Sequence, residues 1–360
     1  MSYTAPPLLA GDAFELARRV SLALDTELAA TERPEDRMVC LSRHWQEVTA
    51  LGWAATLVPE EAGGVGGALA DLAALADGAG RAAFALPLAS SFAVVPCLLR
   101  AAGARGEAAL AALAAGTMHI VPLLPPVAPG ADAPHLEAGR LEGSLAGIEA
   151  PPAPTHLLIP CEDALVLVPA EAGGITLTPF QRIDGRLTFD VSLHLPVTEE
   201  MVLGRGPAVP EAVARARDLG ALLTCVEAVS AMAAIVEQTI TYLLDRKQFG
   251  TTLSTFQALR HRVAEMYLAT MNLRALITPM LREDADPSWQ DIAFAKLRLG
   301  EAGRLVAHGT IQLHGGMGQT EGMPAIRLAR RVLMAEFEYG DRSWHASRLL
   351  AAREAEMAHA

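Results

Sequence analysis

An α+β fold in three segments is what the sequence predicts. Apolar residues recur at three- and four-residue spacings from about residue 12 to 115, as in "DAFELARRVSLALDTEL", and this spacing is typical of amphipathic helices. Short β-like runs replace it from about residue 117, and helical spacing returns at Glu211. We therefore predict an N-terminal helical domain at 1–116, a middle antiparallel β domain at 117–209 and a C-terminal helical bundle at 210–360.

The middle segment is predicted to be a β-sheet because its apolar runs are short and are separated by turn residues. These runs are "THLLIP", "ALVLVP", "GITLTP", "RLTFDVSLHLPV" and "EMVLG". β-branched residues bounded by Gly, Pro and Asp are typical of strands. We expect the strands to pair mainly with their neighbours along the chain, in an antiparallel sheet or barrel.

The last segment contains long apolar stretches of helical spacing joined by short turns. The first is "EAVARARDLGALLTCVEAVSAMAAIVEQTITYLLDRKQFG", and "STFQALRHRVAEMYLATMNLRALITPML" and "WQDIAFAKLRLGEAGRLVAHGTIQLHGG" follow it. Long helices with short connections favour an antiparallel four-helix bundle.

Composition and charge exclude several classes of protein. The formal net charge is −12 and the pI is near 5.3, whereas general nucleic-acid and anionic-membrane binders are basic. The longest apolar run, Ala221 to Val236, contains Glu227 and is too short to span a bilayer. The first residues do not have the basic and apolar regions of a secretory signal. We expect a cytoplasmic protein without nucleic-acid or membrane partners.

The cysteines give no indication of a metal centre or of disulfides. Cys40, Cys97, Cys161 and Cys225 are far apart in the sequence and form no CxxC pair. Zinc sites and disulfide frameworks have characteristic cysteine spacings, which are missing here. We predict four free thiols and no metal site.

Two stretches of the C-terminal segment are more specific than composition. They are "DRKQFGTTLSTFQALRHRVAEM" (245–266) and "IQLHGGMGQTEGMPAIRLARR" (311–331). Together with "VPEEAGG" (58–64) and the helix–strand–helix order, they resemble the acyl-CoA dehydrogenase family over nearly the whole chain. The resemblance implies an FAD flavoprotein that oxidises an acyl-CoA thioester to its 2,3-enoyl product, with electron-transfer flavoprotein as the acceptor.

The resemblance also implies a tetramer in which the arginine of "RKQFG" and the "QLHGG" segment reach the FAD of a neighbouring subunit. An arginine fork suits a pyrophosphate, aromatic rings can pack on a flat ring, and glycines allow close approach of the backbone. A helix end capped by glycine is the alternative interpretation of "HGG". The predicted FAD contacts are Arg246, Gln248, Phe249, Phe256, Gln257, Gln312, Gly315 and Gly316.

The position of the general base departs from the family pattern. The reaction requires a carboxylate that removes the α-proton of the thioester, and most family members place this glutamate just before Gly-Thr or Gly-Ser. Counted without gaps from Gly316, the position holds Tyr339 in "EFEYGD". A tyrosine with an ordinary pKa near 10 is a poor base at neutral pH. Glu338 and Asp341, on either side, are therefore the candidate catalytic acids.

Two further elements are weak. Some members place the glutamate early in the helix before "RKQFG", where this chain has Gly220, with Asp218 the nearest acid and Arg217 out of register. The flavin-binding loop at the start of the middle domain is represented by "LLPPVAPGADAPH" (123–135), without the family's Thr-Glu and Ser. The half of the FAD site donated to a neighbour is retained better than the half that a subunit supplies for itself.

Three hypotheses remain open. The chain resembles the shorter partner subunit of heteromeric bacterial members, which donates FAD contacts while its partner supplies the base. It could instead be an autonomous homo-oligomeric dehydrogenase with a relocated carboxylate, or a non-catalytic scaffold subunit. The acyl group cannot be read from the sequence.

Overall fold

A computed structural model describes residues 3–127, 133–282 and 285–359 of the chain. The chain divides into two compact units. One comprises Met1–Ala30, Ala73–Phe84 and Ala221–Ala360, and the other comprises Thr31–Leu72 and Ala85–Gly220. The units interleave in sequence because α3 (Leu69–Ala79) and the long α6 (Ala208–Asp245) each run from one unit into the other. The three domains predicted from the sequence stay a prediction.

Most of the β structure lies in the unit formed by residues 31–72 and 85–220, in two four-stranded sheets. One sheet has the order β1-β4-β5-β8 and the other β2-β3-β7-β6. In β7, buried and exposed residues alternate from Phe189 to Pro196, as expected for a strand with one face toward a core. The strands are β1 (Ile120–Pro122), β2 (His135–Glu137), β3 (Arg140–Glu149), β4 (His156–Cys161), β5 (Ala164–Pro169), β6 (Ile175–Gln181), β7 (Leu187–Pro196) and β8 (Val202–Arg205).

Helices accompany these sheets. The π-helical turn at Ser90–Val94 and α4 (Val95–Ala101) contact β1, and α5 (Ala104–Ala114) contacts β8. The helix α2 (Pro34–Ala50) also belongs to this unit and buries Trp45, whose ring stacks on that of Phe92 at 5.3 Å.

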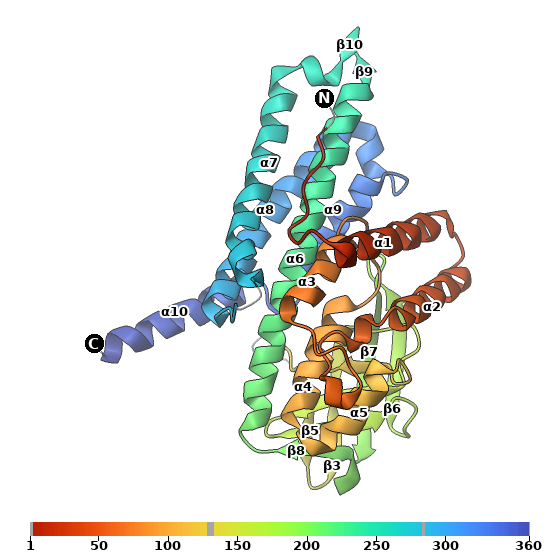
Figure 1. Cartoon of the computed structure of the whole chain (residues 1–360), viewed down its shortest axis with the longest axis vertical. Helices are drawn as coiled ribbons and strands as arrows, with labels where there is room; N and C mark the ends of the chain where they lie inside the picture. Colours follow the sequence, from red (N-terminus) through yellow and green to blue (C-terminus); the bar gives the residue numbers. More distant parts are fainter. Residues whose placement is uncertain (1–2, 128–132, 283–284, 360) are drawn as a thin grey trace. The chain divides into compact units, whose positions relative to one another are not determined.

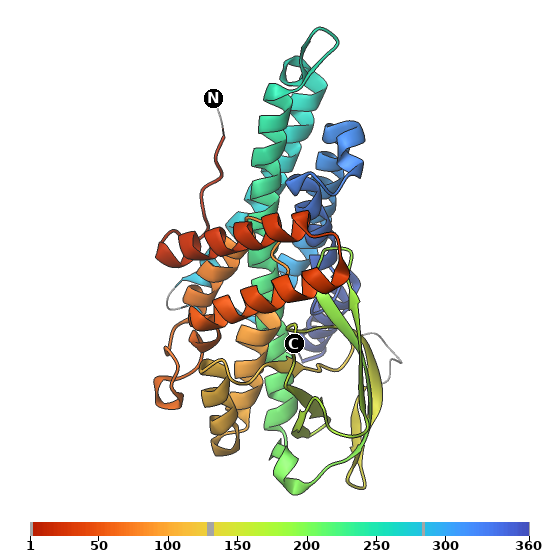
Figure 2. The ribbon, with the colours of Figure 1, turned by 90° about the vertical axis from the view of Figure 1, so that its right-hand side faces the viewer.

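The other unit is dominated by helices. Beside α1 (Asp12–Ala30) it contains most of α6 and four further helices: α7 (Gln257–Ile277), α8 (Trp289–His314), α9 (Pro324–Ala335) and α10 (Arg342–His359). The helices α6 and α7 run alongside each other and are joined at one end by a hairpin of β9 (Lys247–Gln248) and β10 (Thr251–Thr252) (Figures 1 and 2). The helix α8 contacts α7, α9 and α10.

The α+β fold class, with its middle β-strands and helical C-terminal region, is confirmed. One pairing differs from the antiparallel expectation, because β1 pairs with β4 in parallel, with Val121 opposite Leu157. The parallel orientation is possible because β2 and β3 lie between β1 and β4 in the chain. Such a long connection lets the chain return and run beside β1 in the same direction.

The predictions for the cysteines and for the apolar run can also be compared with the structure. None of the four cysteines, all of which are among the described residues, forms a disulfide, as predicted. The apolar run lies within α6, which at 38 residues is long and apolar enough to cross a membrane. Its most apolar window is fully buried inside the protein, and the core helices of globular proteins have the same composition.

Candidate functional site

The predicted "RKQFG" contacts lie in the hairpin between α6 and α7. Arg246 follows α6 directly, and its backbone N–H still donates to Tyr242 O at 2.9 Å. Phe249 occupies the tip with a φ of 53° and is 88% exposed. Its ring meets that of Phe256 edge to face, with centroids 6.1 Å apart. The hairpin thus presents an aromatic side chain to solvent in a backbone conformation that few non-glycine residues adopt.

The "QLHGG" segment ends α8 at the same end of the helical bundle. Gly315 has a φ of 58°, which ends the helix, and no atom lies within 4 Å of where a Cβ would stand on Gly315 or Gly316. Tyr242, one turn before Arg246, contacts this segment: its ring stacks on His314 at 4.3 Å and its hydroxyl donates to His314 O at 3.3 Å. The structure therefore places the end of α6, which leads into the first motif, against the second motif.

His314 itself is buried, and its role is visible from its bonds. Its Nδ1 lies 2.9 Å from Thr310 O, one turn earlier, and burial lowers the pKa of the imidazole. The neutral ring can then donate from Nδ1 and stack on Tyr242. It links the ends of α6 and α8 at the base of the two motifs.

The residues of this end fit the adenylate and pyrophosphate part of FAD by their chemistry. Among the described residues, no hydrogen bond or ion pair engages the Arg246 guanidinium or the amide side chains of Gln248, Gln257 and Gln312. An uncompensated guanidinium, free amides, exposed rings and open backbone beside two glycines form a suitable donor set for a charged, flat ligand. The individual contacts with FAD stay predictions.

The expected base position lies at the end of α9, where a buried ion network surrounds Glu338. Both carboxylate oxygens of Glu338 accept from Arg331, from Nη1 and from Nη2, at 2.7 Å each. The third donor of Arg331, Nε, bonds to Glu227 at 2.7 Å. The Arg331 side chain is 2% exposed and that of Glu338 is 9% exposed. The Glu338 carboxylate therefore faces a buried guanidinium.

The backbone after α9 is fixed by Lys296, which the sequence reasoning did not single out. Its buried Nζ donates to the carbonyls of Ala335, Glu336 and Glu338, at 2.7, 3.1 and 2.7 Å. These are carbonyls that a helix end leaves without partners. Burial lowers the pKa of the Lys296 ammonium. One side chain thus closes the end of α9 just before Tyr339.

The turn that follows is built on Tyr339 and Gly340. Tyr339 has a φ of 57° and Gly340 a φ of 105°. A Cβ on Gly340 would lie 2.4 Å from Cε3 of Trp344, so only glycine fits. Asp341 then begins the next helix, because its Oδ1 accepts from the backbone N–H of Trp344 at 2.8 Å, which is the geometry of an N-cap.

The basic cluster "RLARR" is divided among separate acids. Arg327 forms a two-bond pair with Asp25, Arg330 pairs with Glu321, and Arg331 belongs to the network around Glu338. Its charges are therefore compensated within this unit.

The other expected elements are less informative. Part of the flavin-loop segment 123–135, residues 128–132, lies outside the described residues. Near the alternative base position, Arg217 donates to Pro125 O at 2.5 Å, which anchors the described start of that segment. Within the residues that the structure describes, Asp218 is buried and takes part in further polar or charge contacts.

The sequence interpretation missed Tyr242, Lys296 and Glu227. Tyr242 lies four residues before Arg246, so the helical repeat places both on one face, and this spacing could have identified it. Lys296 and Glu227 are isolated charges in apolar helical stretches. Such charges are rarely buried without a partner, which is the signal that could have found them.

Comparison with known proteins identifies the C-terminal region. Residues 211–353 match the family described as "Acyl-CoA dehydrogenase, C-terminal domain". This region is an acyl-CoA dehydrogenase C-terminal domain. The chain is thus related to acyl-CoA dehydrogenases.

Individual relatives agree. Acyl-CoA dehydrogenase IpdE2 of Mycobacterium tuberculosis is 28% identical over 273 residues, which cover 75% of this chain and 73% of that protein. IpdE2 of Mycolicibacterium smegmatis is 35% identical over 103 residues, only 29% of this chain and 32% of that protein. The ChsE4-ChsE5 complex from Mycobacterium tuberculosis contains a chain of the same fold, with a TM-score of 0.79, 21% identity and coverage of 98% and 99%.

Proposed function

We propose that this chain is a subunit of an FAD-dependent acyl-CoA dehydrogenase that donates contacts to the FAD of a neighbouring chain and supplies no base of its own. One observation carries the proposal. The predicted FAD contacts are exposed and the Arg246 guanidinium is uncompensated, whereas the Glu338 carboxylate beside the base position accepts two bonds from a buried arginine.

The bonds from Arg331 decide whether Glu338 is suited to act as the base. Removal of a thioester α-proton requires a carboxylate with a lone pair directed at that proton, and its pKa should be raised toward the working pH. A guanidinium bonded to both oxygens stabilises the ionised form and occupies those lone pairs. Asp341 has a structural task at the start of α10. Neither acid meets the requirements of the base.

The remaining steps belong to other groups. FAD, when bound, accepts the β-hydrogen of the acyl group as hydride. The residues of this chain would hold the adenylate end of the cofactor: Arg246 opposite the pyrophosphate, Phe249 and Phe256 against flat surfaces, and the backbone of Gly315 and Gly316 in close approach. A second acyl-CoA dehydrogenase-like subunit would supply the base, and electron-transfer flavoprotein is the proposed acceptor of the electrons.

This assignment is tested by purifying the chain alone and, separately, after co-expression with a second acyl-CoA dehydrogenase-like chain. We expect bound flavin and acyl-CoA oxidation only after co-expression. A yellow, active preparation of the chain alone would support the autonomous enzyme instead. If neither preparation held flavin, the chain would be a scaffold subunit.

The two candidate acids are tested in whichever preparation is active. We expect the conservative variants Glu338→Gln and Asp341→Asn to keep the acyl-CoA turnover of the wild type within about two-fold, since loss of a true catalytic base typically costs about 100-fold or more. A drop of that size in either variant, with unchanged flavin content, would show that this chain supplies the base.

A further inference from the structure

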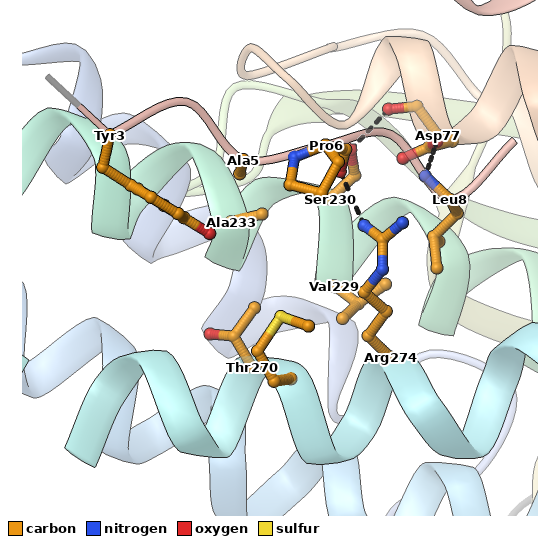
Figure 3. Close-up of a pocket in the computed structure, with 11 residues that line it drawn as sticks. Tyr3, Ala5, Pro6, Leu8, Asp77, Val229, Ser230, Ala233, Thr270 and Arg274 are labelled. Carbon is orange, nitrogen blue, oxygen red and sulfur yellow. Dashed lines mark hydrogen bonds between the residues drawn. The ribbon is translucent and has the colours of Figure 1, made fainter. Parts of the chain in front are cut away.

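Residues 3–9 form an extended segment that crosses three helices of its unit without regular secondary structure (Figure 3). Its contacts are mostly made by its own backbone. We call Tyr3–Leu9 the clasp.

On α7 the clasp is held by Arg274 and Tyr267. The Arg274 guanidinium donates to two successive carbonyls, to Pro6 O at 2.6 Å (Figure 3) and to Pro7 O. The ring of Tyr3 meets that of Tyr267 edge to face at 5.6 Å. Prolines suit this position because they have no N–H that would be left without a partner.

On α3 and α6 the clasp is held by carboxylates. Asp77 accepts from the backbone N–H groups of Leu8 and Leu9 at 2.5 and 3.1 Å, and Glu237 accepts from Ala5 N–H at 3.2 Å. Ser230 on α6 donates to the backbone carbonyl of Asp77 at 2.6 Å. The three helices are thus connected through one short segment.

The clasp fits closely on the side that faces α7, whereas on the side of α1 it borders a hollow of about 440 Å³ that Thr4, Ala5 and Pro7 help to line. The space beneath it has a volume of about 10 Å³ and is lined by clasp residues together with Asp77, Ser230, Thr270 and Arg274 (Figure 3). A space of this size holds about one water molecule. Movement of α7 relative to α6 would therefore break clasp contacts rather than be absorbed by a gap.

Two of the three helices that the clasp joins, α6 and α7, carry the hairpin of Arg246, Gln248 and Phe249. At about 1.5 Å per residue, Glu237 lies roughly 13 Å before Arg246, and Tyr267 lies roughly 15 Å beyond Gln257. Helices transmit a displacement over such distances because their backbones are internally bonded. The geometry of the hairpin therefore depends on how α6 and α7 are held together.

We propose that the clasp fixes α7 against α6 and so positions the hairpin, with Arg274 as the positioning residue that fastens it. The clasp touches none of the predicted FAD contacts. Its consequence for cofactor affinity rests on the proposed function, whereas its consequence for the order of the hairpin does not.

Amide hydrogen exchange of the full chain with Arg274→Ala tests the proposal. We expect faster exchange in residues 3–9 and, at least about five-fold, in residues 247–253, a coupling of the size typical between distant sites. Arg353→Ala is the matched control, because Arg353 pairs with Glu356 on α10, and both side chains are more than half exposed. Tyr3→Ala removes only the ring contact with Tyr267, and we expect amide exchange to become faster in both segments.

Flavin titration of the same variants in the co-expressed complex gives the second readout. We expect the Kd for FAD to rise at least about five-fold in Arg274→Ala and to stay unchanged in Arg353→Ala. Faster exchange in residues 3–9 of Arg274→Ala with unchanged exchange in residues 247–253 would overturn the proposal. Unchanged exchange in residues 3–9 of this variant would overturn it as well. Absence of flavin from the unmodified complex would instead overturn the proposed function.

Discussion

At the scale of single residues, the most informative group is Arg331. It is fully buried and bonds to Glu227 and to both oxygens of Glu338. If one member of a buried ion network is removed, the remaining charges stay buried without a partner. The resulting loss of folding free energy is larger than the difference between the intact network and apolar residues of similar volume. The ion network therefore makes the end of α9 sensitive to substitution.

We predict that Arg331→Ala lowers the free energy of unfolding by about 3–5 kcal/mol, measured by urea denaturation at neutral pH. Arg330→Ala is the matched control. Its partner Glu321 has a side chain that is 74% exposed, and exposed pairs contribute less than about 1 kcal/mol. Equal effects of the two substitutions would contradict the importance of the buried network.

His345 should make the protein sensitive to acid. Burial, followed by the positive charges of Lys296 and Arg348, lowers the pKa of this imidazole from 6.5 to about 3. The folded state therefore binds the proton less well than the unfolded state. Its contribution to stability is complete above pH 6.5 and is lost as the pH falls toward about 3, with a slope of up to about 1.4 kcal/mol per pH unit.

Urea unfolding of the wild type and of His345→Asn between pH 7 and pH 4 measures this slope. We expect the variant to be less stable at pH 7, because a buried side chain has been changed, but to lose stability less steeply as the pH falls. His308→Asn, at an exposed position of α8, is the control. Parallel curves for the wild type and His345→Asn would show that His345 does not titrate on unfolding.

At the scale of elements, the hairpin between α6 and α7 combines local strain with exposure. Phe249 has a positive φ and projects into solvent, and Gly250 follows it with a φ of 80°. An exposed aromatic side chain contributes little to the stability of its own fold. Stability therefore does not account for its position, whereas the proposed contact with flavin would.

We predict that Phe249→Ala changes the free energy of unfolding of the isolated chain by less than about 0.5 kcal/mol but lowers the flavin content of the co-expressed complex. Absorbance of flavin relative to protein after gel filtration measures the second effect. Phe294→Ala is the control, because Phe294 on α8 is also exposed, at 52%. Equal flavin retention in the two variants would remove Phe249 from the predicted contacts.

At the scale of the whole molecule, the proposal that this chain supplies only part of an FAD site predicts the ratio of flavin to protein chains. A chain that donates adenylate contacts but lacks the base and the family's own flavin-loop residues completes no FAD site alone. We predict about one flavin for every two chains in the co-expressed assembly. Light scattering with a flavin assay measures this ratio, and one flavin per chain would favour the autonomous enzyme.

The sequence predicted the order of helices, strands and helices well, because hydrophobic spacing and turn residues are local properties. It also identified the two motif segments, but not the packing contact of Tyr242 with His314 that holds α6 against α8 beside them. The parallel pairing of β1 with β4 was not predictable, since it depends on which strand closes the edge of the sheet.

The segment around the expected base shows most clearly which features depend on tertiary packing. By itself the sequence determined that Tyr339 occupies the expected position, with Glu338 and Asp341 beside it. Only the tertiary structure decided what these acids contact: Arg331, four residues before the end of α9, bonds to Glu338, and Asp341 caps α10. The physical reason is that spacing fixes which residues share a helix face, whereas the partners of a buried charge come from other helices that packing brings against it.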